Sequence, residues 1–281
     1  MSNVSKAVLI TGCSTGIGRA TAERMAGHGW TVYATARRLG SIADLERKGC
    51  RTIALDVTDD SSMSAAVARV EAEEGAVGAL VNNAGYAVEG AAEPTAMDMI
   101  RRQFETNVFG LIRMCQLVLP RMRRQGWGRI VNVSSVGGKL AFPGGAYYHA
   151  TKHAVEGFSD VLRFEVARFG VSVSIIEPGL IKTAFGDTAT DPIDTAGAGP
   201  YAAFNEAVIK RVGGAYEGMM GRLAAGPEAV ARVIERAISS SRPRTRYRIT
   251  MGARVTLTTR KFVPDRIWDA MMSMQFPRPS E

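Results

Sequence analysis

A tyrosine and a lysine, Tyr148 and Lys152, stand four residues apart in a segment with a helical pattern. This spacing places both side chains on one face of a helix, one turn apart. A phenol has a pKa of about 10, whereas proton transfer at neutral pH needs a lower one, and a fixed ammonium nearby favours the phenolate. The neighbouring Tyr147 has Thr151 four residues on and lacks such a partner. The pair therefore predicts proton transfer by Tyr148, although such pairs also arise by chance.

Polar groups at two other points could complete this site. Ser135 follows an apolar run at residues 129–134, 13 residues before the tyrosine, and its hydroxyl could hold a carbonyl oxygen. Ser134 is the alternative for that role. Asn107 lies beside an apolar helical stripe from Ile100 to Met122, where an amide next to buried surface needs a partner.

A glycine-rich turn stands near the N-terminus, between an apolar run and a helical pattern. Glycines let the backbone turn sharply and approach a pyrophosphate, whose charge is favoured by the N–H groups and dipole of the following helix. A plain tight turn is the alternative. The context of strand, turn and helix predicts a phosphate site made by Gly12, Ser14, Thr15, Gly16, Ile17 and Gly18.

The residues after the second apolar run favour NADP over NAD. Dinucleotide-binding folds often carry an acid there that binds the ribose hydroxyls, but this sequence has Arg37 and Arg38, and no acid before Asp44. Arginine can bind a 2′-phosphate through two parallel hydrogen bonds, whereas a carboxylate would repel it. Alternatively, both arginines are solvated turn residues. Asp56, after the third run, could reach the adenine or merely cap Thr58.

The elements that position these residues alternate between strands and helices. Runs rich in β-branched residues predict strands at 6–11, 31–36, 51–56, 79–82, 129–134, 171–177 and 245–250. Helical patterns appear at 16–28, 41–48, 59–74, 100–122, 147–169, 227–239 and 263–276. The alternation predicts an α/β fold with a doubly wound parallel sheet of about seven strands and helices on both faces. Ligands bind at the carboxyl ends of such strands, where these motifs fall.

Composition limits the classes of function. The chain has 281 residues, 46% hydrophobic and 22% charged, which is typical of a globular protein and of a single domain over 1–281. No apolar stretch approaches the roughly 18 residues of a membrane span, and the N-terminus does not have the pattern of a signal peptide. Cys13, Cys50 and Cys115 and the three histidines lack metal-ligand spacing. We therefore expect no metal, and buried thiols in a reduced, cytoplasmic protein.

The net charge of +8 lies mostly near the C-terminus. Residues 226–281 hold 11 Lys and Arg against 5 Asp and Glu, a surplus of 6 that leaves +2 for the remainder. Seven bases between Arg242 and Lys261 precede the apolar-rich segment 263–276, which could contact anionic lipid peripherally, or a partner. Alternatively, the alternating arginines of strand 245–250 form a solvated sheet edge. Stacking aromatics do not alternate with these bases, so we expect no nucleic-acid binding.

Taken in order, the motifs resemble those of the short-chain dehydrogenase/reductase family in its compact form. The matching residues are Thr11-Gly12-x3-Gly16-Ile17-Gly18, Asp56-Val57, Asn83-Ala84-Gly85, Asn107-Val108, Ser135, Tyr148-x3-Lys152 and Pro178-Gly179-x3-Thr183. The resemblance is strong up to about residue 185 and loose beyond it. It implies a Rossmann-type dehydrogenase domain and hydride transfer between a nicotinamide and a carbonyl or alcohol carbon of a small molecule.

The resemblance also implies a role for each matching residue. Tyr148 would be the general acid/base, with Lys152 lowering its pKa and binding the nicotinamide ribose. Ser135 would polarise the substrate oxygen, and Asn107 would hold a water that relays protons. The other implied cofactor-binding residues are Asp56, Val57, Asn83, Ala84, Gly85, Pro178, Gly179, Ile181 and Thr183, although Asn83 could be a turn residue alone. The family often pairs its two longest helices, which implies a homodimer or homotetramer.

The cofactor and substrate depend on parts of the chain where the resemblance is weaker. Many NADP-using members carry a base where this chain has Thr15, so the expected NADP(H) rests on Arg37 and Arg38. Nine large apolar residues lie within region 184–225, which in this family covers the substrate. They predict a bulky apolar substrate, such as a steroid, retinoid or long-chain carbonyl compound, or else they only complete the core. Residues 251–281 form a C-terminal extension.

A function without catalysis is the alternative. The same fold could serve as an NADP(H)-binding sensor that turns nothing over. The complete set of Tyr148, Lys152, Ser135 and Asn107 argues against this, because a sensor needs no proton relay.

Overall fold

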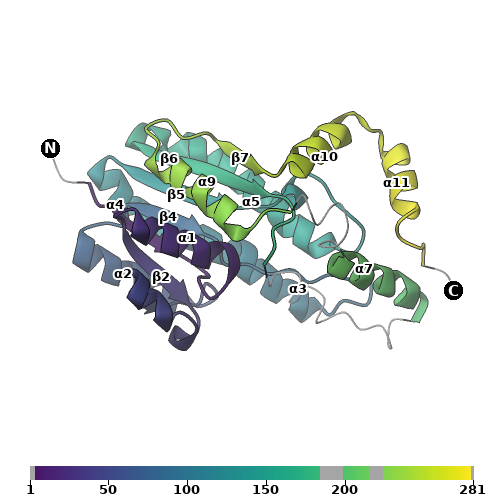
Figure 1. Ribbon diagram of the computed structural model, residues 1–281, viewed down its shortest axis with the longest axis horizontal. Coiled ribbons are helices and arrows are strands. Elements are labelled where there is room, and N and C mark those ends of the chain that lie inside the picture. The colour runs from purple at the N-terminus through teal and green to yellow at the C-terminus, as the bar shows by residue number, and fades with distance from the viewer. Residues whose placement is uncertain (1–3, 184–198, 215–223, 280–281) are drawn as a thin grey trace.

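A seven-stranded parallel sheet forms the centre of the computed structural model, which describes residues 4–183, 199–214 and 224–279 (Figure 1). The strands are β1 (Ala7–Ile10), β2 (Thr31–Ala36), β3 (Arg51–Ala54), β4 (Ala79–Asn82), β5 (Gly128–Val133), β6 (Val171–Pro178) and β7 (Arg246–Ile249). They lie in the order β3-β2-β1-β4-β5-β6-β7, and all neighbours are parallel. The α/β fold with a doubly wound sheet that the sequence predicted is confirmed.

Helices cover both faces of this sheet. One face carries α1 (Gly16–Gly27) and α9 (Pro227–Ser239), and the other carries α2 (Asp60–Glu74), α4 (Gly110–Gln125) and α5 (Ala146–Val166). Successive side chains of a strand point to opposite faces, so β1 contributes to two separate cores. Ala7 and Leu9 pack in the core of α2, α4 and α5, whereas Val8 and Ile10 pack in that of α1 and α9. A strand buried on both faces must be apolar at every position, which explains its continuous run.

The strand order creates a switch point between β1 and β4. From β1 the chain moves outward through β2 to β3, and it then returns to pair β4 on the other side of β1. A crevice opens at the carboxyl ends of the strands at such a point. The glycine-rich turn follows β1, Asn83-Ala84-Gly85 follows β4 and Ser135 follows β5, so the topology brings these motifs to one edge.

Three helical segments differ from the sequence prediction. The helix predicted at 100–122 is α3 (Met97–Phe104), a π-helical turn η3 (Glu105–Phe109) and then α4. The short helix predicted at 41–48 is two 3₁₀ turns, η1 (Leu39–Ser41) and η2 (Ala43–Lys48). Helix α10 (Met251–Phe262) was not predicted, because its threonines and valine are typical of strands. The remaining short turns are η4 (Val136–Gly138), η5 (Ala167–Phe169) and η6 (Gly199–Tyr201).

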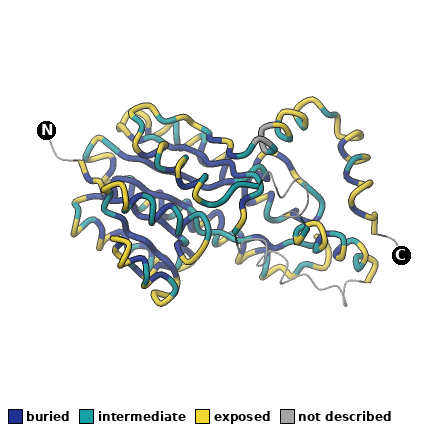
Figure 2. Tube along the Cα trace, in the orientation of Figure 1, coloured by how far each residue is buried: buried dark blue, intermediate teal, exposed yellow. Residues whose placement is uncertain are grey.

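The C-terminal extension packs beside the region expected to cover the substrate. Trp268 and Met272 of α11 (Asp265–Ser273), together with Phe276, form an apolar cluster with Val208 of α7 (Ala202–Gly214). Buried and exposed residues alternate along α11 (Figure 2). Of region 184–225, the segments 184–198 and 215–223 lie outside the described residues, and part of the apolar set predicted there falls on them. Among the helices that the structure describes, none has both the length and the apolar character to cross a bilayer.

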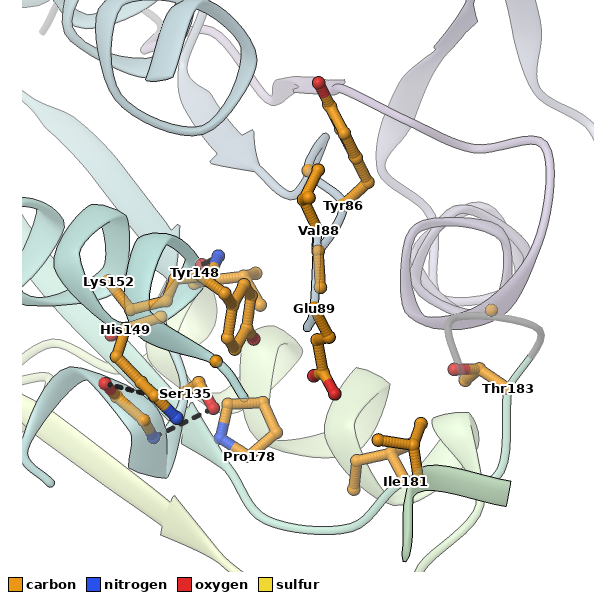
Figure 3. Close-up of a pocket in the computed structure, with 18 of the residues that line it drawn as sticks. Tyr86, Val88, Glu89, Ser135, Tyr148, His149, Lys152, Pro178, Ile181 and Thr183 are labelled. Carbon is orange, nitrogen blue, oxygen red and sulfur yellow. Dashed lines mark hydrogen bonds between the residues drawn. The ribbon is translucent and has the colours of Figure 1, made fainter. Parts of the chain in front are cut away.

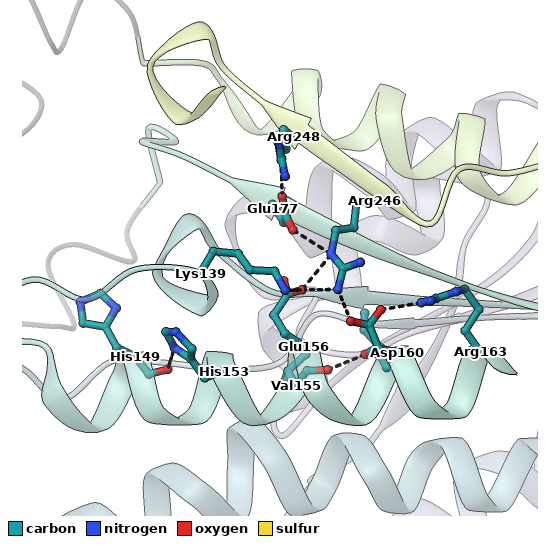
Figure 4. A network of polar contacts seen from close by, with 12 residues as sticks. Lys139, His149, His153, Val155, Glu156, Asp160, Arg163, Glu177, Arg246 and Arg248 are labelled. Carbon is teal, nitrogen blue, oxygen red and sulfur yellow. Dashed lines mark hydrogen bonds and ion pairs between the residues drawn. The ribbon is translucent and has the colours of Figure 1, made fainter. Parts of the chain in front are cut away.

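The alternating arginines of β7 are not simply solvated, so that prediction was wrong in part. β7 is the sheet edge, as expected, but the Nε of Arg246 lies 3.1 Å from Glu177 Oε1, and its Nη2 lies 3.0 Å from Glu156 Oε2 (Figure 4). Arg248 pairs with the other oxygen of Glu177 at 3.0 Å. Both carboxylates are buried in the fold, and a buried charge requires a counter-ion.

Candidate active site

The turn after β1 is shaped to receive an anion. Gly12 has a φ of +72°, and a Cβ on Gly18 would lie 2.3 Å from the Gly12 carbonyl oxygen, so both positions require glycine. Helix α1 begins beyond it with no side-chain cap and no acid in its first turn. Its first N–H groups are therefore directed at the crevice, where a phosphate could accept their hydrogen bonds.

Asn83 ties this turn to the end of β4. Its Nδ2 donates to the carbonyl oxygens of Thr11 and Gly12, each at 2.9 Å, and its backbone N–H donates to Thr11 Oγ1 at 3.0 Å. The N–H of Ala84 donates to the same hydroxyl at 3.0 Å. Asn83 is thus more than a turn residue, because it fixes the two strand ends on either side of the switch point.

The end of β2 presents two exposed arginines. Neither Arg37 nor Arg38 forms an ion pair within the described residues, and Arg37 lines the main cavity whereas Arg38 does not. The nearest following acid, Asp44, is held by Arg19. Asp56 accepts hydrogen bonds from the N–H and the hydroxyl of Thr58, at 2.9 and 2.8 Å, so it caps that turn while still lining the cavity.

Tyr148 and Lys152 occupy one face of α5, as their spacing predicted. The Lys152 side chain is buried, donates to the Val133 carbonyl oxygen at 2.9 Å and places its Nζ 5.7 Å from the centroid of the Tyr148 ring. Burial lowers the pKa of Lys152 to about 8, while the charge of Glu156 one turn further on opposes that shift. Tyr147 points elsewhere, because its hydroxyl donates to a backbone carbonyl before α3.

Of the two serines after β5, Ser135 is the one that a ligand can reach. Its Oγ accepts a hydrogen bond from the Gly137 N–H at 3.0 Å and faces the cavity across from Glu89 (Figure 3). The Ser134 Oγ is fully buried, and a Cβ on Gly138 would lie 2.7 Å from it. These positions favour Ser135 over Ser134 for contact with a substrate oxygen.

Asn107 lies in the π-helical turn, and the partners that its amide needs are present. Its Oδ1 accepts from the N–H of Tyr86 at 3.0 Å, and its Nδ2 donates to the Tyr86 carbonyl at 2.8 Å and to Thr151 Oγ1 at 3.2 Å. A Cβ on Gly85 would lie 3.0 Å from Asn107 Oδ1 and 3.8 Å from Lys152 Nζ. Asn107 therefore stands behind Gly85, close to the lysine, rather than in the cavity wall.

One cavity of about 1760 Å³ unites most of the predicted residues. Pockets for one small ligand commonly measure about 300–1,000 Å³, so this volume accommodates a dinucleotide with a second molecule. The predicted residues that line it are Gly12, Ser14, Thr15, Gly16, Ile17, Arg37, Asp56, Val57, Asn83, Ala84, Gly85, Ser135, Tyr148, Lys152, Pro178, Gly179, Ile181 and Thr183. Gly18, Arg38 and Asn107 are not among its lining residues.

The chain after β6 closes the cavity opposite the glycine turn. Thr183 comes so close that a Cβ on Gly16 would lie 3.2 Å from its Cγ2. Ile181 is buried and forms a β-bridge with Ala225. This segment therefore borders the turn on which a dinucleotide would lie.

Sequence reasoning missed several residues at the far end of the cavity, among them Glu89, Phe142, His149 and Phe276. The Nδ1 of His149 lies 3.1 Å from the Gly137 carbonyl oxygen, and burial lowers the pKa of this imidazole. Glu89 had a signal, since it is a lone acid in the apolar stretch after Asn83-Ala84-Gly85. Phe142 and Phe276 had none. The described residues contain no group of three or more His, Cys, Asp or Glu that could hold a metal ion.

Comparisons with known proteins agree on one family. A family model described as short chain dehydrogenase matches residues 6–193, which contain every predicted site residue. The 3-ketodihydrosphingosine reductase of Bacteroides thetaiotaomicron is 38% identical over 184 residues, which are 64% of this chain and 65% of that protein. Retinol dehydrogenase 5 of Homo sapiens is 33% identical over 291 residues, which cover 98% of this chain and 90% of that protein. The closed form of serine dehydrogenase complexed with NADP+ superposes with a TM-score of 0.75 at 27% identity, covering 87% of this chain and 94% of the other.

Proposed function

The chain belongs to the short-chain dehydrogenase/reductase family and is an oxidoreductase, and we propose that it interconverts a carbonyl and an alcohol using NADP(H). One observation carries the proposal. Buried Lys152 lies beside the ring of Tyr148, in the same cavity as the uncapped glycine turn. An acid/base pair and a phosphate site that share a cavity are what a nicotinamide-dependent reductase requires.

Each residue of the site has a distinct task in this proposal. Bound NADPH would supply the hydride. Tyr148 gives its proton to the carbonyl oxygen, and the Lys152 ammonium stabilises the phenolate that remains. The Ser135 hydroxyl donates a hydrogen bond to the same oxygen and orients it. Asn107 holds the segment at Tyr86 in place and stands close enough to the lysine to support a water that returns the proton.

The proposed substrate is apolar, of retinoid, steroid or lipid type. Phe142, Val208, Val212 and Phe276 line the cavity beyond Tyr148, and they favour a bulky hydrocarbon body. Two relatives are named for retinol and for 3-ketodihydrosphingosine, which supports the same class. Val208 lines the cavity and also packs against α11, which supports both the predicted lid and the predicted completion of the core.

The absorbance of NADPH tests the proposal directly. The protein is mixed with NADPH and, in turn, with retinal, a steroid ketone and a long-chain alkyl ketone, and the decrease at the nicotinamide band is followed. We expect oxidation that depends on at least one of these carbonyl compounds. Saturable NADPH binding without turnover of any of them, or of the matching alcohols with NADP+, would instead support the sensor.

The preference for NADP(H) is proposed to depend on Arg37. We expect Arg37→Ala to lower the ratio of kcat/KM for NADPH to that for NADH by about tenfold or more, because a charge-assisted bond to the 2′-phosphate is lost. Steady-state kinetics with both cofactors measure the ratio. Arg47→Ala is the matched control, since Arg47 is exposed nearby and does not line the cavity. An unchanged ratio would contradict the assignment of Arg37.

We also propose that the protein forms a homodimer or homotetramer through α5. Phe164 is 86% exposed and Val161 is 59% exposed on this helix, and such apolar surface usually meets another protein. Light scattering is expected to give a mass of two or four chains, and Phe164→Glu to reduce it. A monomeric mass for the unmodified protein would contradict this proposal.

The cytoplasmic location remains part of the proposal. Cys13, Cys50 and Cys115 are free and buried, which suits a reducing compartment. Peripheral contact of the basic extension with lipid stays a prediction, although the burial of Trp268, Met272 and Phe276 uses part of its apolar face.

A further inference from the structure

The carboxylate of Glu89 projects into the cavity from the segment between β4 and α3. Its backbone is held firmly on both sides. Asn107 binds the N–H and the carbonyl of Tyr86, and the N–H of Gly90 donates to the carbonyl of Gly144 at 2.7 Å. These contacts hold the backbone on both sides of Glu89 and so position its side chain at the cavity.

The surroundings of this carboxylate are unfavourable for a charge. Its neighbours Ala87 and Val88 are buried, and burial raises the pKa of Glu89 to about 7. Figure 3 shows its oxygens directed into the cavity, toward the wall made by Pro178 and Ile181 and across from Tyr148. An acid in such a place costs folding free energy unless it finds a hydrogen-bond donor.

The described part of the chain does not supply that donor. The cationic side chains that line the same cavity are Arg37, Arg102, Lys152, Lys210 and Arg211. None of them forms an ion pair with Glu89, and Lys152 instead donates to the Val133 carbonyl. The donor that the carboxylate lacks would then come from the molecule that fills the cavity.

We propose that Glu89 determines substrate specificity by accepting a hydrogen bond from a second polar group of the substrate, a hydroxyl or an ammonium. The substrate class is then an amphipathic carbonyl compound, with an apolar body against Phe142 and Val208 and a hydrogen-bond donor against Glu89. This inference rests on the proposed carbonyl reduction and narrows it. A substrate that fills the cavity removes water from the half-buried Glu89 carboxylate. A site that binds a substrate donor then discriminates strongly against the analogue without one, because the desolvated acceptor is left unpaired.

A matched set of ketones tests the inference. The probes are 2-dodecanone and 2-dodecanones that carry one hydroxyl or one dimethylammonium group at successive carbons, the tertiary amine being unable to condense with the ketone. We expect the wild type to prefer at least one substituted ketone over 2-dodecanone by roughly tenfold to a hundredfold in kcat/KM. Glu89→Leu is expected to reverse that preference, lowering kcat/KM for the substituted ketone and raising it for 2-dodecanone.

Two further variants identify the donor and the site. Glu89→Gln retains an acceptor but no charge, so it should keep a preference for a hydroxyl and lose one for an ammonium. Asp98→Leu removes an exposed acid at the start of α3 that does not line the cavity, and it should keep the wild-type ratios of kcat/KM. A merely structural role of Glu89 would lower all rates together and leave the ratios unchanged.

The inference and the proposed function fail in different ways. If the ratio of kcat/KM for the substituted ketone to that for 2-dodecanone is equal in the wild type and in Glu89→Leu, and 2-dodecanone is still reduced by NADPH, the proposed role of Glu89 is overturned while the proposed function stands. The absence of NADPH oxidation with every ketone, including those outside this set, overturns the proposed function itself. A hydroxyl or ammonium preference that disappears in Glu89→Leu supports both.

Discussion

Tyr148→Phe is expected to lower kcat for carbonyl reduction by roughly 10²–10⁴-fold, the usual contribution of a positioned proton donor. The change removes one oxygen and keeps the ring, which lies 5.8 Å from His149 and 5.7 Å from the Lys152 ammonium. Because the variant retains the aromatic ring and its packing, NADPH binding should persist, with a dissociation constant within a few-fold of the wild type. Steady-state kinetics and nicotinamide fluorescence measure the two quantities separately.

Tyr147→Phe is the matched control for this experiment. Tyr147 precedes the proposed donor directly, but its hydroxyl donates to the Ala92 carbonyl oxygen rather than entering the site. We expect this variant to retain kcat within a few-fold. Turnover that survives Tyr148→Phe would refute the assignment of the proton donor, and turnover lost equally in both variants would indicate a structural effect.

The sequence was sufficient to predict the fold and the placement of its polar and glycine motifs at one edge of the sheet, for a physical reason. In a parallel sheet the strands are apolar along their whole length, and the carboxyl ends meet at one edge. Polar or glycine residues that directly follow such runs, such as Gly12, Asn83 and Ser135, are therefore positioned by topology alone. Tyr148 and Lys152 needed only the helical period.

The parts that escaped prediction depend on contacts between distant segments. The π-helical turn at Glu105–Phe109 places Asn107 against Tyr86 and Thr151, and no local pattern announces those partners. Phe276 reaches the cavity because α11 packs on α7, through residues far apart in the chain. A periodicity argument uses neighbouring residues, so it could not place either group.

The ion pairs of the β7 arginines also could not be predicted from a local sequence pattern. Alternation along an edge strand predicts one solvated face. It does not show that Glu156 of α5 and Glu177 of β6 are buried beneath that face, each with a side-chain exposure of 3% or less. The acids and Arg246 are separated by about 70 to 90 residues, so only the folded chain brings them together.

Arg246→Met is expected to reduce the free energy of unfolding by about 3 kcal/mol, because removing one partner of a buried ion pair leaves carboxylates uncompensated. Arg246 is the shared partner of Glu156, Glu177 and Asp160. Lys139 and Arg248 remain to neutralise part of this charge. The expected loss is therefore at the low end of the roughly 3–5 kcal/mol that breaking a buried ion pair costs. Urea denaturation monitored by tryptophan fluorescence measures the change.

The loss should depend on pH in a definite direction. Burial already raises the pKa of Glu177, the charge of Glu156 raises it further, and the two arginines oppose both. Without Arg246 the carboxyl pKa in the folded state rises further above its unfolded value, so the folded variant binds more protons and gains stability as pH falls. We therefore expect the destabilisation to be larger at pH 8 than at pH 5.5, and Glu177→Gln to recover part of it in the same background.

Arg242→Met, at an exposed position outside the network, should change stability by less than about 0.5 kcal/mol. An Arg246→Met loss that is small, or equal at both pH values, would mean that the buried carboxylates are already neutral in the wild type.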